Sequence, residues 1–500
     1  MNYYLVGIYI ATVTTLVLSH YLEKTSLKII GKLIGYSLLA LATMISYESK
    51  LIDDLSVTIG LSFSIIASMI SIYTITYTNV LHYPKYTELL MDIFLLLITS
   101  SYIAPSFILL VIAWTISEII GYTLIKIGEE HSTEGSLTSS RGFIFASTMT
   151  FELSVFTMIA ISTFFTAANI GLYELVKPFT ERAITVMVPS IIIPILVIGF
   201  LVKAANIPLH FWLPSAHSSA PSPASAALSG LMVSLGYYGL YRVLEYIDIE
   251  NYKTSISWSL ATIGFLSIIY GGSQALSQRD SKKLLAYSTI ATNGFISIVF
   301  SIHLLQPIQI TKLAVVLGIL MHAAYKATLF CEAGLVEIVY GTRYIHGVKG
   351  FVNIAPISTI GGLLSVFSLL GMPGTLGFSV KLISVYCSLL LINISPLFAL
   401  TSVIGILAYI IISALIALRY SRIYYGERYS RIEILVSEVS KNLQVAILLM
   451  GLLNVLLFLV TTMLIIFEFS YLLALLAPIA FLAMFITYSQ FKAVSMVPRQ

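Results

Sequence analysis

The sequence predicts an all-α polytopic membrane protein. Of its 500 residues, 58% are hydrophobic and 10% are charged, and the mean hydropathy is +0.96. Soluble domains carry about 25% charged residues. The apolar residues form blocks of roughly 17 to 25, which is the length of a membrane-spanning helix and more than the roughly ten residues of a membrane-barrel strand. Because hydrocarbon offers no partner for backbone polar groups, we expect these blocks to be helical.

The apolar blocks place candidate spans along almost the whole chain. Several blocks are interrupted by proline or glycine, so about 14 membrane-spanning helices are expected. Cys331 and Cys387 lie inside spans without ligand spacing around them, so neither a disulfide framework nor a metal or iron–sulfur site is expected in this chain. The predicted spans are residues 3–19, 28–46, 55–77, 86–101, 103–127, 141–166, 183–207, 222–247, 255–276, 282–303, 310–340, 354–393, 395–417, 441–467 and 470–491.

Lysine and arginine residues are distributed unevenly over the connections between spans. If the N-terminus is outside, most of the 27 lysines and arginines fall on the inner side, Lys32 and Lys282 among them. Short cytoplasmic loops hold such an excess, so we expect the N-terminus to be outside. The outer side receives Lys50, Lys177, Arg182, Arg242, Lys253 and Lys312.

Three remaining lysines lie within predicted spans. Lys203, Lys326 and Lys381 would each cost roughly 2.5–3.5 kcal/mol at the centre of a membrane helix. Snorkelling toward an interface is the ordinary alternative, but Lys326 lies about midway along its span. Lys203 and Lys381 lie beside segments broken by proline and glycine, where a water-lined cavity is the expected environment.

Acidic residues also fall within the predicted spans. Trp114 and Glu118 share one helix face. A buried carboxylate is rarely left alone, so Glu118 and one of the lysines are candidate partners. Glu152 is equally well explained as a helix-packing acid bonded to a neighbouring hydroxyl. Glu332 and Glu337 approach the inner end of their span and are expected to be solvated.

A short phrase containing lysine occurs twice. GFLVK at 199–203 and GFSVK at 377–381 differ at one position, and each adjoins a break, IPLHFWLPSAHSSAPSP after the first and GMPGTLG before the second. Proline and glycine there free backbone groups. Because an odd number of predicted spans separates the copies, the second runs the opposite way through the bilayer. This pattern favours an inverted repeat.

Four segments resemble a known family. They match, in the family's order, the signatures of the antiporter-like subunits shared by complex I, membrane-bound hydrogenases and Mrp-type cation/proton antiporters. The resemblance covers roughly residues 100–420. The segments are KAANIPLHFWLPSAHSSAPSPASAALSGLMVSLGYYGLYR at 203–242, RDSKKLLAYSTIATNGFI at 279–296, HAAYKATLFCEAG at 322–334 and GMPGTLGFSVK at 371–381.

The resemblance implies a bundle of about 14 helices with two inverted five-helix repeats, each with a discontinuous helix. It divides the chain into N-terminal transmembrane helices at 1–85, a first repeat half at 86–250, a second at 251–425 and C-terminal helices at 426–500. In the family, buried charged residues and waters carry protons along the middle of the membrane. By position, this relay would consist of Glu118, Lys203, Lys326, Lys381 and His322.

The sequence departs from the family pattern at three positions. The family's acid usually follows its tryptophan directly, whereas Glu118 comes four residues after Trp114. Relative to the usual position of the acid, Glu118 is shifted by three residues. This is close to one helical turn, about 4.5 Å of rise, so Glu118 can still pair with Lys203. Ser234 stands where a second lysine is usual, and Thr292 where many members have histidine. Both hydroxyls can bind water but carry no exchangeable charge near neutral pH.

Two histidines flank the first broken helix. His210 and His217 lie near Pro208 and Pro214, and they either assist proton entry or tie down the break. With Ser234 and Thr292, they are the candidate supporting groups of the water and proton path.

The leading functional expectation is a proton-translocating, antiporter-like subunit of a complex I-type respiratory quinone oxidoreductase, similar to the M and N chains. The energy would come from partners, because the chain has no nucleotide-binding motif and no redox site. Iron–sulfur clusters and quinone are expected in partner subunits, which include other membrane subunits and a peripheral redox arm. The other expected partners are the bilayer and protons, with Na⁺ as an alternative ion and no nucleic acid, in a prokaryotic plasma membrane. The alternatives are a component of an Mrp-type sodium/proton antiporter or membrane-bound hydrogenase, and a non-pumping scaffold.

Overall fold

The computed structural model describes residues 3–131, 138–164, 175–181, 190–245, 247–426 and 441–468. The expectation of an all-helical polytopic chain is confirmed in these ranges. The helices are α1 (Tyr3–His20), α2 (Thr25–Glu48), α3 (Asp54–Val80), α4 (Tyr86–Tyr102), α5 (Phe107–His131), α6 (Ser139–Phe164), α8 (Ile192–Lys203), α9 (Leu213–Ser219), α10 (Ser222–Ala227), η1 (Leu228–Met232), α11 (Leu235–Leu244), α12 (Lys253–Ser277), α13 (Ser281–Leu305), α14 (Gln309–Tyr340), η2 (Ile345–Gly347), α15 (Phe351–Ile354), α16 (Pro356–Leu370), α17 (Leu376–Leu390), α18 (Pro396–Tyr420), η3 (Ser421–Ile423) and α19 (Lys441–Glu468).

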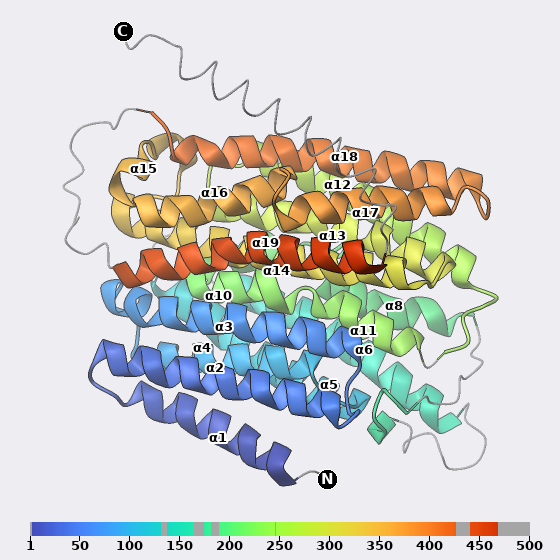
Figure 1. The fold of residues 1–500 in the computed structure, drawn as a ribbon, viewed down its shortest axis with the longest axis horizontal. Coiled ribbons are helices and arrows are strands. Elements are labelled where there is room, and N and C mark those ends of the chain that lie inside the picture. The colour runs from blue at the N-terminus through green and yellow to red at the C-terminus, as the bar shows by residue number, and fades with distance from the viewer. Residues whose placement is uncertain are drawn as a thin grey trace.

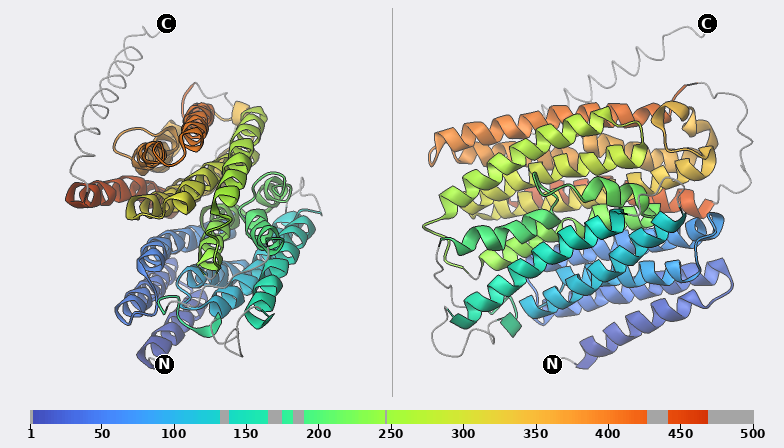
Figure 2. Two further views of the ribbon diagram at one scale, coloured as in Figure 1. Left: turned by 90° about the vertical axis from the view of Figure 1, so that its right-hand side faces the viewer. Right: turned by 180° about the vertical axis from the view of Figure 1, so that it is seen from behind.

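The long helices lie side by side in one bundle (Figure 1). Seen end-on, helices of the N-terminal half gather on one side and those from α12 onward on the other (Figure 2). The helix α14 joins the two sides, because it packs against α3 and α10 as well as α13, α16 and α17. We call the end that holds the α1–α2, α3–α4 and α12–α13 connections the basic end, and the other the opposite end.

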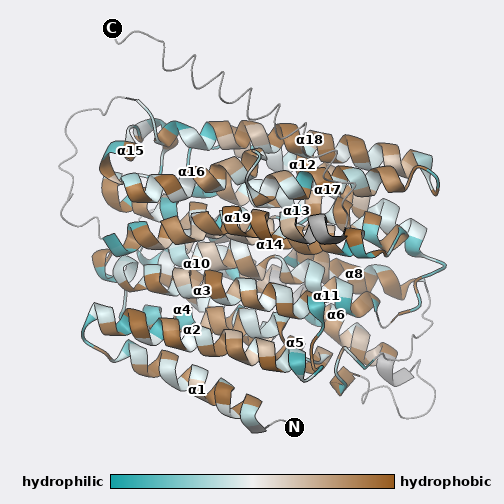
Figure 3. Ribbon diagram, viewed as in Figure 1, coloured by the Kyte–Doolittle hydropathy of each residue, from teal (hydrophilic) through white to brown (hydrophobic). Residues whose placement is uncertain are grey.

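The hydropathy of the helices fits a membrane environment. Nine helices of the described ranges are long and apolar enough to cross a membrane, and four apolar helices are shorter. Apolar residues run along most helices, and the connections at the ends are more hydrophilic (Figure 3). The predicted span at 470–491 and the predicted outer residue Arg182 lie outside the described residues. The total of about 14 spans stays a prediction.

The helical path is broken at two places. After α8 the chain leaves the helix at Lys203 and resumes at Leu213 in α9. The predicted block at 354–393 is not one helix, because α16 ends at Leu370 and α17 begins at Leu376. Gly371 ends α16 with φ +86°, a left-handed conformation that favours glycine.

A buried arginine joins two helices at the opposite end. Arg242 of α11 is 1% exposed and donates hydrogen bonds of 2.9 and 2.6 Å to the Asp53 carboxylate. Asp53 also caps α3 by accepting a 3.0 Å hydrogen bond from the Ser56 backbone N–H. Partial burial raises the pKa of Asp53, but the Arg242 guanidinium outweighs it, so this pKa lies well below its usual range. The pair stabilises the bundle end that faces away from the basic connections.

Candidate functional site

The first element of the site is a buried ion pair between α5 and α8. Lys203 Nζ lies 2.8 Å from Glu118 Oε1, and both side chains are 0% exposed. The Trp114 indole N–H donates a 3.0 Å hydrogen bond to the same carboxylate oxygen. The one-turn displacement of Glu118 along α5 is therefore compatible with contact to Lys203.

Aromatic rings surround the Lys203 ammonium. Its Nζ lies 5.0 Å from the Phe143 ring centre and 5.8 Å from that of Trp212. Such ring faces attract a cation, and they also keep bulk solvent away from it. Coulombic attraction within the pair is consequently much stronger than it would be in water.

The chain break beside Lys203 is held by side chains from other elements. Asn293 of α13 donates a 2.6 Å hydrogen bond to the Ala204 carbonyl, and the Trp212 indole donates one of 3.0 Å to the Val202 carbonyl. These donors satisfy carbonyls that an uninterrupted helix would have paired. The lysine thus stands at the C-terminal end of a half-helix, where a positive charge is favoured.

Close packing brings α11 against this half-helix. Gly236 faces the end of α8, and a Cβ at this position would lie 2.5 Å from the Phe200 carbonyl oxygen. Ser234 lies just before α11 and is fully buried. Its hydroxyl has no hydrogen-bond partner among the described residues. Ser234, where the resemblance leads us to expect a second lysine, thus places a buried hydroxyl beside the helix of Lys203.

The second lysine lies in the middle of the bundle. Lys326 of α14 is 0% exposed, and its ammonium donates hydrogen bonds to the Leu285 carbonyl, at 2.5 Å, and to the Ser288 hydroxyl. It also lies over the rings of Tyr325 and Phe330, at 5.5 and 5.9 Å. Snorkelling to an interface does not describe this lysine, because its head group is held inside the bundle by α13.

A cluster of hydroxyls lies between Lys326 and the third lysine. Thr292 lies 2.6 Å from the Tyr325 hydroxyl and 3.1 Å from that of Tyr409, and it donates a 2.9 Å hydrogen bond to the Ser288 carbonyl. All three side chains are buried. We call Thr292, Tyr325 and Tyr409 the hydroxyl bridge. The three hydroxyl groups of this bridge lie within hydrogen-bond distance of one another through Thr292.

The third lysine closes the second helix break. Lys381 of α17 donates hydrogen bonds of 2.6 Å to the Leu369 carbonyl of α16 and 2.8 Å to the Ser413 hydroxyl of α18. Its Nζ lies 5.4 Å from the Tyr409 ring centre. Lys381 therefore lies beside one tyrosine ring of the hydroxyl bridge and Lys326 beside the other.

The three candidate histidines of the site differ in burial and in their contacts. His217 and His322 are 0% exposed, and neither ring has a hydrogen-bond partner in the described part of the chain. His217 stacks on Phe330, at 4.9 Å between ring centres, and His322 on Tyr325, at 5.9 Å. Both therefore lie beside rings that also face Lys326. His210 is half-buried, with its ring edge against Tyr270, and is away from this group of contacts.

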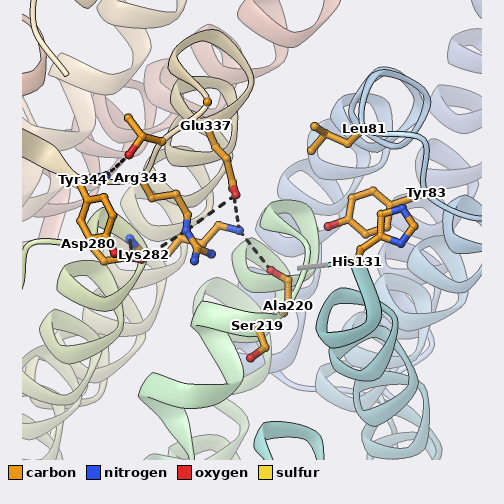
Figure 4. Close-up of a pocket in the computed structure, with 12 residues that line it drawn as sticks. Leu81, Tyr83, His131, Ser219, Ala220, Asp280, Lys282, Glu337, Arg343 and Tyr344 are labelled. Atoms are coloured by element: carbon orange, nitrogen blue, oxygen red, sulfur yellow. Dashed lines mark hydrogen bonds and ion pairs between the residues drawn. The ribbon is translucent and has the colours of Figure 1, made fainter. Parts of the chain in front are cut away.

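A polar cavity of about 320 Å³ opens at the basic end, next to the first broken helix (Figure 4). Lys282 crosses it and contacts both Glu337, at 3.2 Å, and the Ala220 carbonyl, at 3.3 Å. Arg343 lies 3.3 Å from Asp280 and 3.8 Å from Glu337. The cavity wall also includes Ser219, two residues after His217 in the sequence.

One expectation from the sequence is wrong. Glu332 is not solvated: it is 0% exposed and accepts hydrogen bonds from Tyr424, at 2.6 Å, and Tyr420, at 3.3 Å. Lys32 and Lys282, both expected on the inner side, belong to α2 and α13 and are buried, at 0% and 3% exposed. In each case the partner comes from elsewhere in the sequence, which local hydropathy does not reveal.

The contacts of Glu152 agree with the expectation of a helix-packing acid bonded to a neighbouring hydroxyl. It is half-buried and accepts a 3.3 Å hydrogen bond from the Thr115 hydroxyl of α5. No group of three or more histidine, cysteine, aspartate or glutamate side chains suited to a metal ion occurs among the residues that the structure describes. The titratable and hydroxyl groups that the structure brings together in the site are lysines, a glutamate, histidines and the side chains of serine, threonine and tyrosine.

Comparison with known proteins gives one consistent family. Residues 104–408 match the family model described as NADH:quinone oxidoreductase/Mrp antiporter, TM. The chain is 29% identical over 276 residues to NADH-quinone oxidoreductase subunit M of Rickettsia prowazekii, covering 53% of each protein. It is 27% identical over 349 residues to an Na(+)/H(+) antiporter subunit of Alkalihalophilus pseudofirmus, covering 66% of this chain and 41% of the relative.

A solved structure has the same fold. A chain of the Mrp complex from Dietzia sp. DQ12-45-1b superposes with a TM-score of 0.74 at 16% identity, covering 93% of this chain and 96% of that one. The similarity to curated relatives is shorter, since the chain spans only about half, or less, of their length.

Proposed function

Because the chain belongs to the NADH:quinone oxidoreductase/Mrp antiporter family of membrane subunits, we propose that it is a proton-translocating subunit of a complex I-type quinone oxidoreductase. The observation that carries this proposal is the series of three fully or almost fully buried lysines, Lys203, Lys326 and Lys381, each held by polar groups of the bundle. Ionisable groups inside a membrane are costly and usually mark a path for ions. Redox chemistry in partner subunits, with iron–sulfur clusters and quinone, would supply the energy.

Proton movement would begin at the Glu118–Lys203 pair. A buried lysine holds its proton less firmly than one in water, and an adjacent carboxylate restores that affinity. Separation of Glu118 from Lys203 would therefore release a proton from Lys203. Moving one charge across 100 mV requires about 2.3 kcal/mol, and a hundredfold change in proton affinity supplies about 2.7 kcal/mol.

The later steps would use the second half of the chain. Lys326 would accept the proton, with His322 and His217 beside it as intermediate carriers. The hydroxyl bridge would then connect Lys326 with Lys381, because Thr292 is within hydrogen-bond distance of both tyrosines. The polar cavity beside Ser219 supports exchange with the basic end, which the positive-inside rule assigns to the cytoplasm.

A second candidate is a component of an Mrp-type sodium/proton antiporter. The similarity over 66% of this chain to a subunit of such an antiporter favours it. The same buried lysines would then exchange protons against sodium without a redox partner. The two candidates therefore differ in their partner subunits and in the source of energy.

Purification of the native assembly distinguishes the candidates. The tagged chain would be extracted from its own membrane in mild detergent, and the bound proteins identified by mass spectrometry. Co-purification of iron–sulfur subunits with quinone-linked activity is expected. Recovery of small membrane subunits alone, with proton flux that depends on sodium, would replace the oxidoreductase by the antiporter.

A further inference from the structure

A second group of buried charges lies in the N-terminal helices, away from the three lysines described above. Lys28 and Lys32 of α2 face Glu88 and Asp92 of α4, and Tyr36 follows one turn later on α2. We call these five residues the α2–α4 ladder. Both the lysine pair and the acid pair are spaced by four residues, so each pair occupies one helix face.

Hydrogen bonds and ion pairs link each residue of the ladder to the next. Lys28 Nζ lies 2.9 Å from Glu88 Oε2, and Lys32 Nζ lies 3.2 Å from Glu88 Oε1. Lys32 also lies 2.5 Å from Asp92 Oδ2. One ammonium therefore bridges two carboxylates, so a proton can move along the ladder without a large change in structure.

Exposure decreases along the same direction. The side chains of Lys28 and Glu88 are 15% and 5% exposed, whereas those of Lys32 and Asp92 are 0% and 1% exposed. His20 of α1 lies 3.9 Å from Glu88 at the more exposed step. Asp92 is six residues into α4, about 9 Å along the helix axis. The ladder thus leads from the basic end into the bundle.

Hydroxyl groups continue inward from the ladder. Asp92 Oδ1 accepts a hydrogen bond of 3.2 Å from Tyr36 and another from Ser71 of α3. Ser68 and Ser64 are also buried, and with Ser71 they are spaced to share one face of α3. Exchangeable groups therefore extend from Asp92 toward the middle of α3.

Stability alone does not explain these charges. Replacing a buried ion pair by apolar side chains of similar volume is often neutral or stabilising, and apolar residues are abundant in this chain. Ionisable groups within a membrane segment suggest a functional role. We propose that the α2–α4 ladder is a second proton-exchange site, loaded from the basic end at Lys28–Glu88 and holding its proton at Lys32–Asp92.

Protons are conserved in the proposed exchange step. Lys32 gives a proton from Nζ to Asp92 Oδ2, which leaves a neutral amine and a neutral carboxylic acid. The amine then takes a proton from the Lys28–Glu88 pair, and that pair is reprotonated from solvent. The statement that the ladder supplies protons for transport rests on the proposed function, whereas the statement that Asp92 binds a proton does not.

Lys32→Arg tests the exchange directly. Arginine keeps the positive charge and the ion pair, but it does not release its proton in proteins. In membrane vesicles that contain the whole assembly, we expect Lys32→Arg to assemble and to lower proton transport about tenfold. Lys253→Arg is the matched control, because Lys253 forms an exposed pair with Glu250 and should leave transport unchanged.

A double variant covers the case in which the larger guanidinium disturbs the fold. Lys32→Met combined with Asp92→Leu removes both charges together, so no lone buried charge remains. Unchanged transport in every ladder variant that assembles would overturn the role in transport. If Lys203→Ala also transports normally, the proposed function fails as well; if only Lys203→Ala loses transport, the ladder proposal alone fails.

Proton binding at Asp92 has its own readout. Infrared difference spectra between two pH values report carboxyl groups that take up a proton. We expect a carboxyl signal in the wild-type assembly that Asp92→Asn removes and that Lys32→Arg weakens. Identical spectra for the wild type and Asp92→Asn would overturn the exchange site.

Discussion

Lys203 and Glu118 form an ion pair of 2.8 Å between helices α8 and α5, with both side chains completely buried. The Trp114 indole also donates to the Glu118 carboxylate. The pair stands beside a helix break whose carbonyls are held by Asn293 and Trp212. Any rearrangement of this break therefore acts directly on the distance between the two charges.

Glu118→Gln should damage both stability and transport. Removing one partner of a buried pair leaves the other charge uncompensated, at a cost of about 3–5 kcal/mol. We expect a lower melting temperature of the purified assembly and strongly reduced proton transport in vesicles. Glu152→Gln is a useful control because Glu152 is half-buried and bonded only weakly, at 3.3 Å, to Thr115. Equal behaviour of the two variants would contradict a special role of the Glu118 pair.

Tyr409→Phe should interrupt proton movement between Lys326 and Lys381. The substitution keeps the aromatic ring under Lys381 but removes the hydroxyl that lies 3.1 Å from Thr292. We expect transport to fall about tenfold with little loss of assembled protein, measured by dye quenching in vesicles. Tyr425→Phe, at an exposed tyrosine, should change neither quantity. Wild-type transport by Tyr409→Phe would exclude the hydroxyl bridge from the path.

The sequence predicts the main line of buried charges because each one interrupts an apolar block. Lys203, Lys326, Lys381 and Glu118 are visible in this way without any structure. The contact between Glu118 and Lys203 is harder to predict from the sequence, because the two residues are 85 positions apart and lie in different helices. The sequence also indicates the two helix breaks through proline and glycine, although the block at 354–393 gives no clear boundary.

The remaining features depend on contacts between distant helices. Lys32 lies near the start of the predicted span 28–46 and is counted with the inner-side charges, so the sequence does not reveal that Asp92 of α4 holds it inside the bundle. Its four-residue spacing from Lys28, matched by that of Glu88 and Asp92, is the signal that the sequence offers. Thr292 gives no sign of its two tyrosine partners, because they come from α14 and α18.

Gly371→Ala should disturb the second break and the lysine beside it. The residue has φ +86°, where a side chain costs about 1–2 kcal/mol. A Cβ there would also lie 2.8 Å from Lys381 Cδ. We expect a lower melting temperature and reduced transport. Gly142→Ala is the matched control, since a Cβ at that helical position meets no atom within 4 Å; equal loss in both variants would contradict this account.

The Asp53–Arg242 pair should contribute stability that depends on pH. The pKa of Asp53 is lowered in the folded protein, so its contribution is present above the ordinary aspartate pKa and is lost as the pH falls through the folded value. Asp53→Asn should therefore have a lower melting temperature than the wild type at neutral pH. The difference in melting temperature between the two proteins should become smaller in strong acid. A constant difference between the two proteins from neutral pH to below pH about 3 would contradict this coupling.

The role of the Glu118–Lys203 pair is tested most directly by proton transport of Lys203→Ala in the intact assembly. The chain would be expressed in its own membrane, assembly checked by co-purification of its partners, and proton movement followed in inverted vesicles. We expect normal assembly with transport abolished or sharply reduced, because the proton that Glu118 controls has lost its carrier. Wild-type transport by an assembled Lys203→Ala protein would show that this buried pair does not drive proton movement.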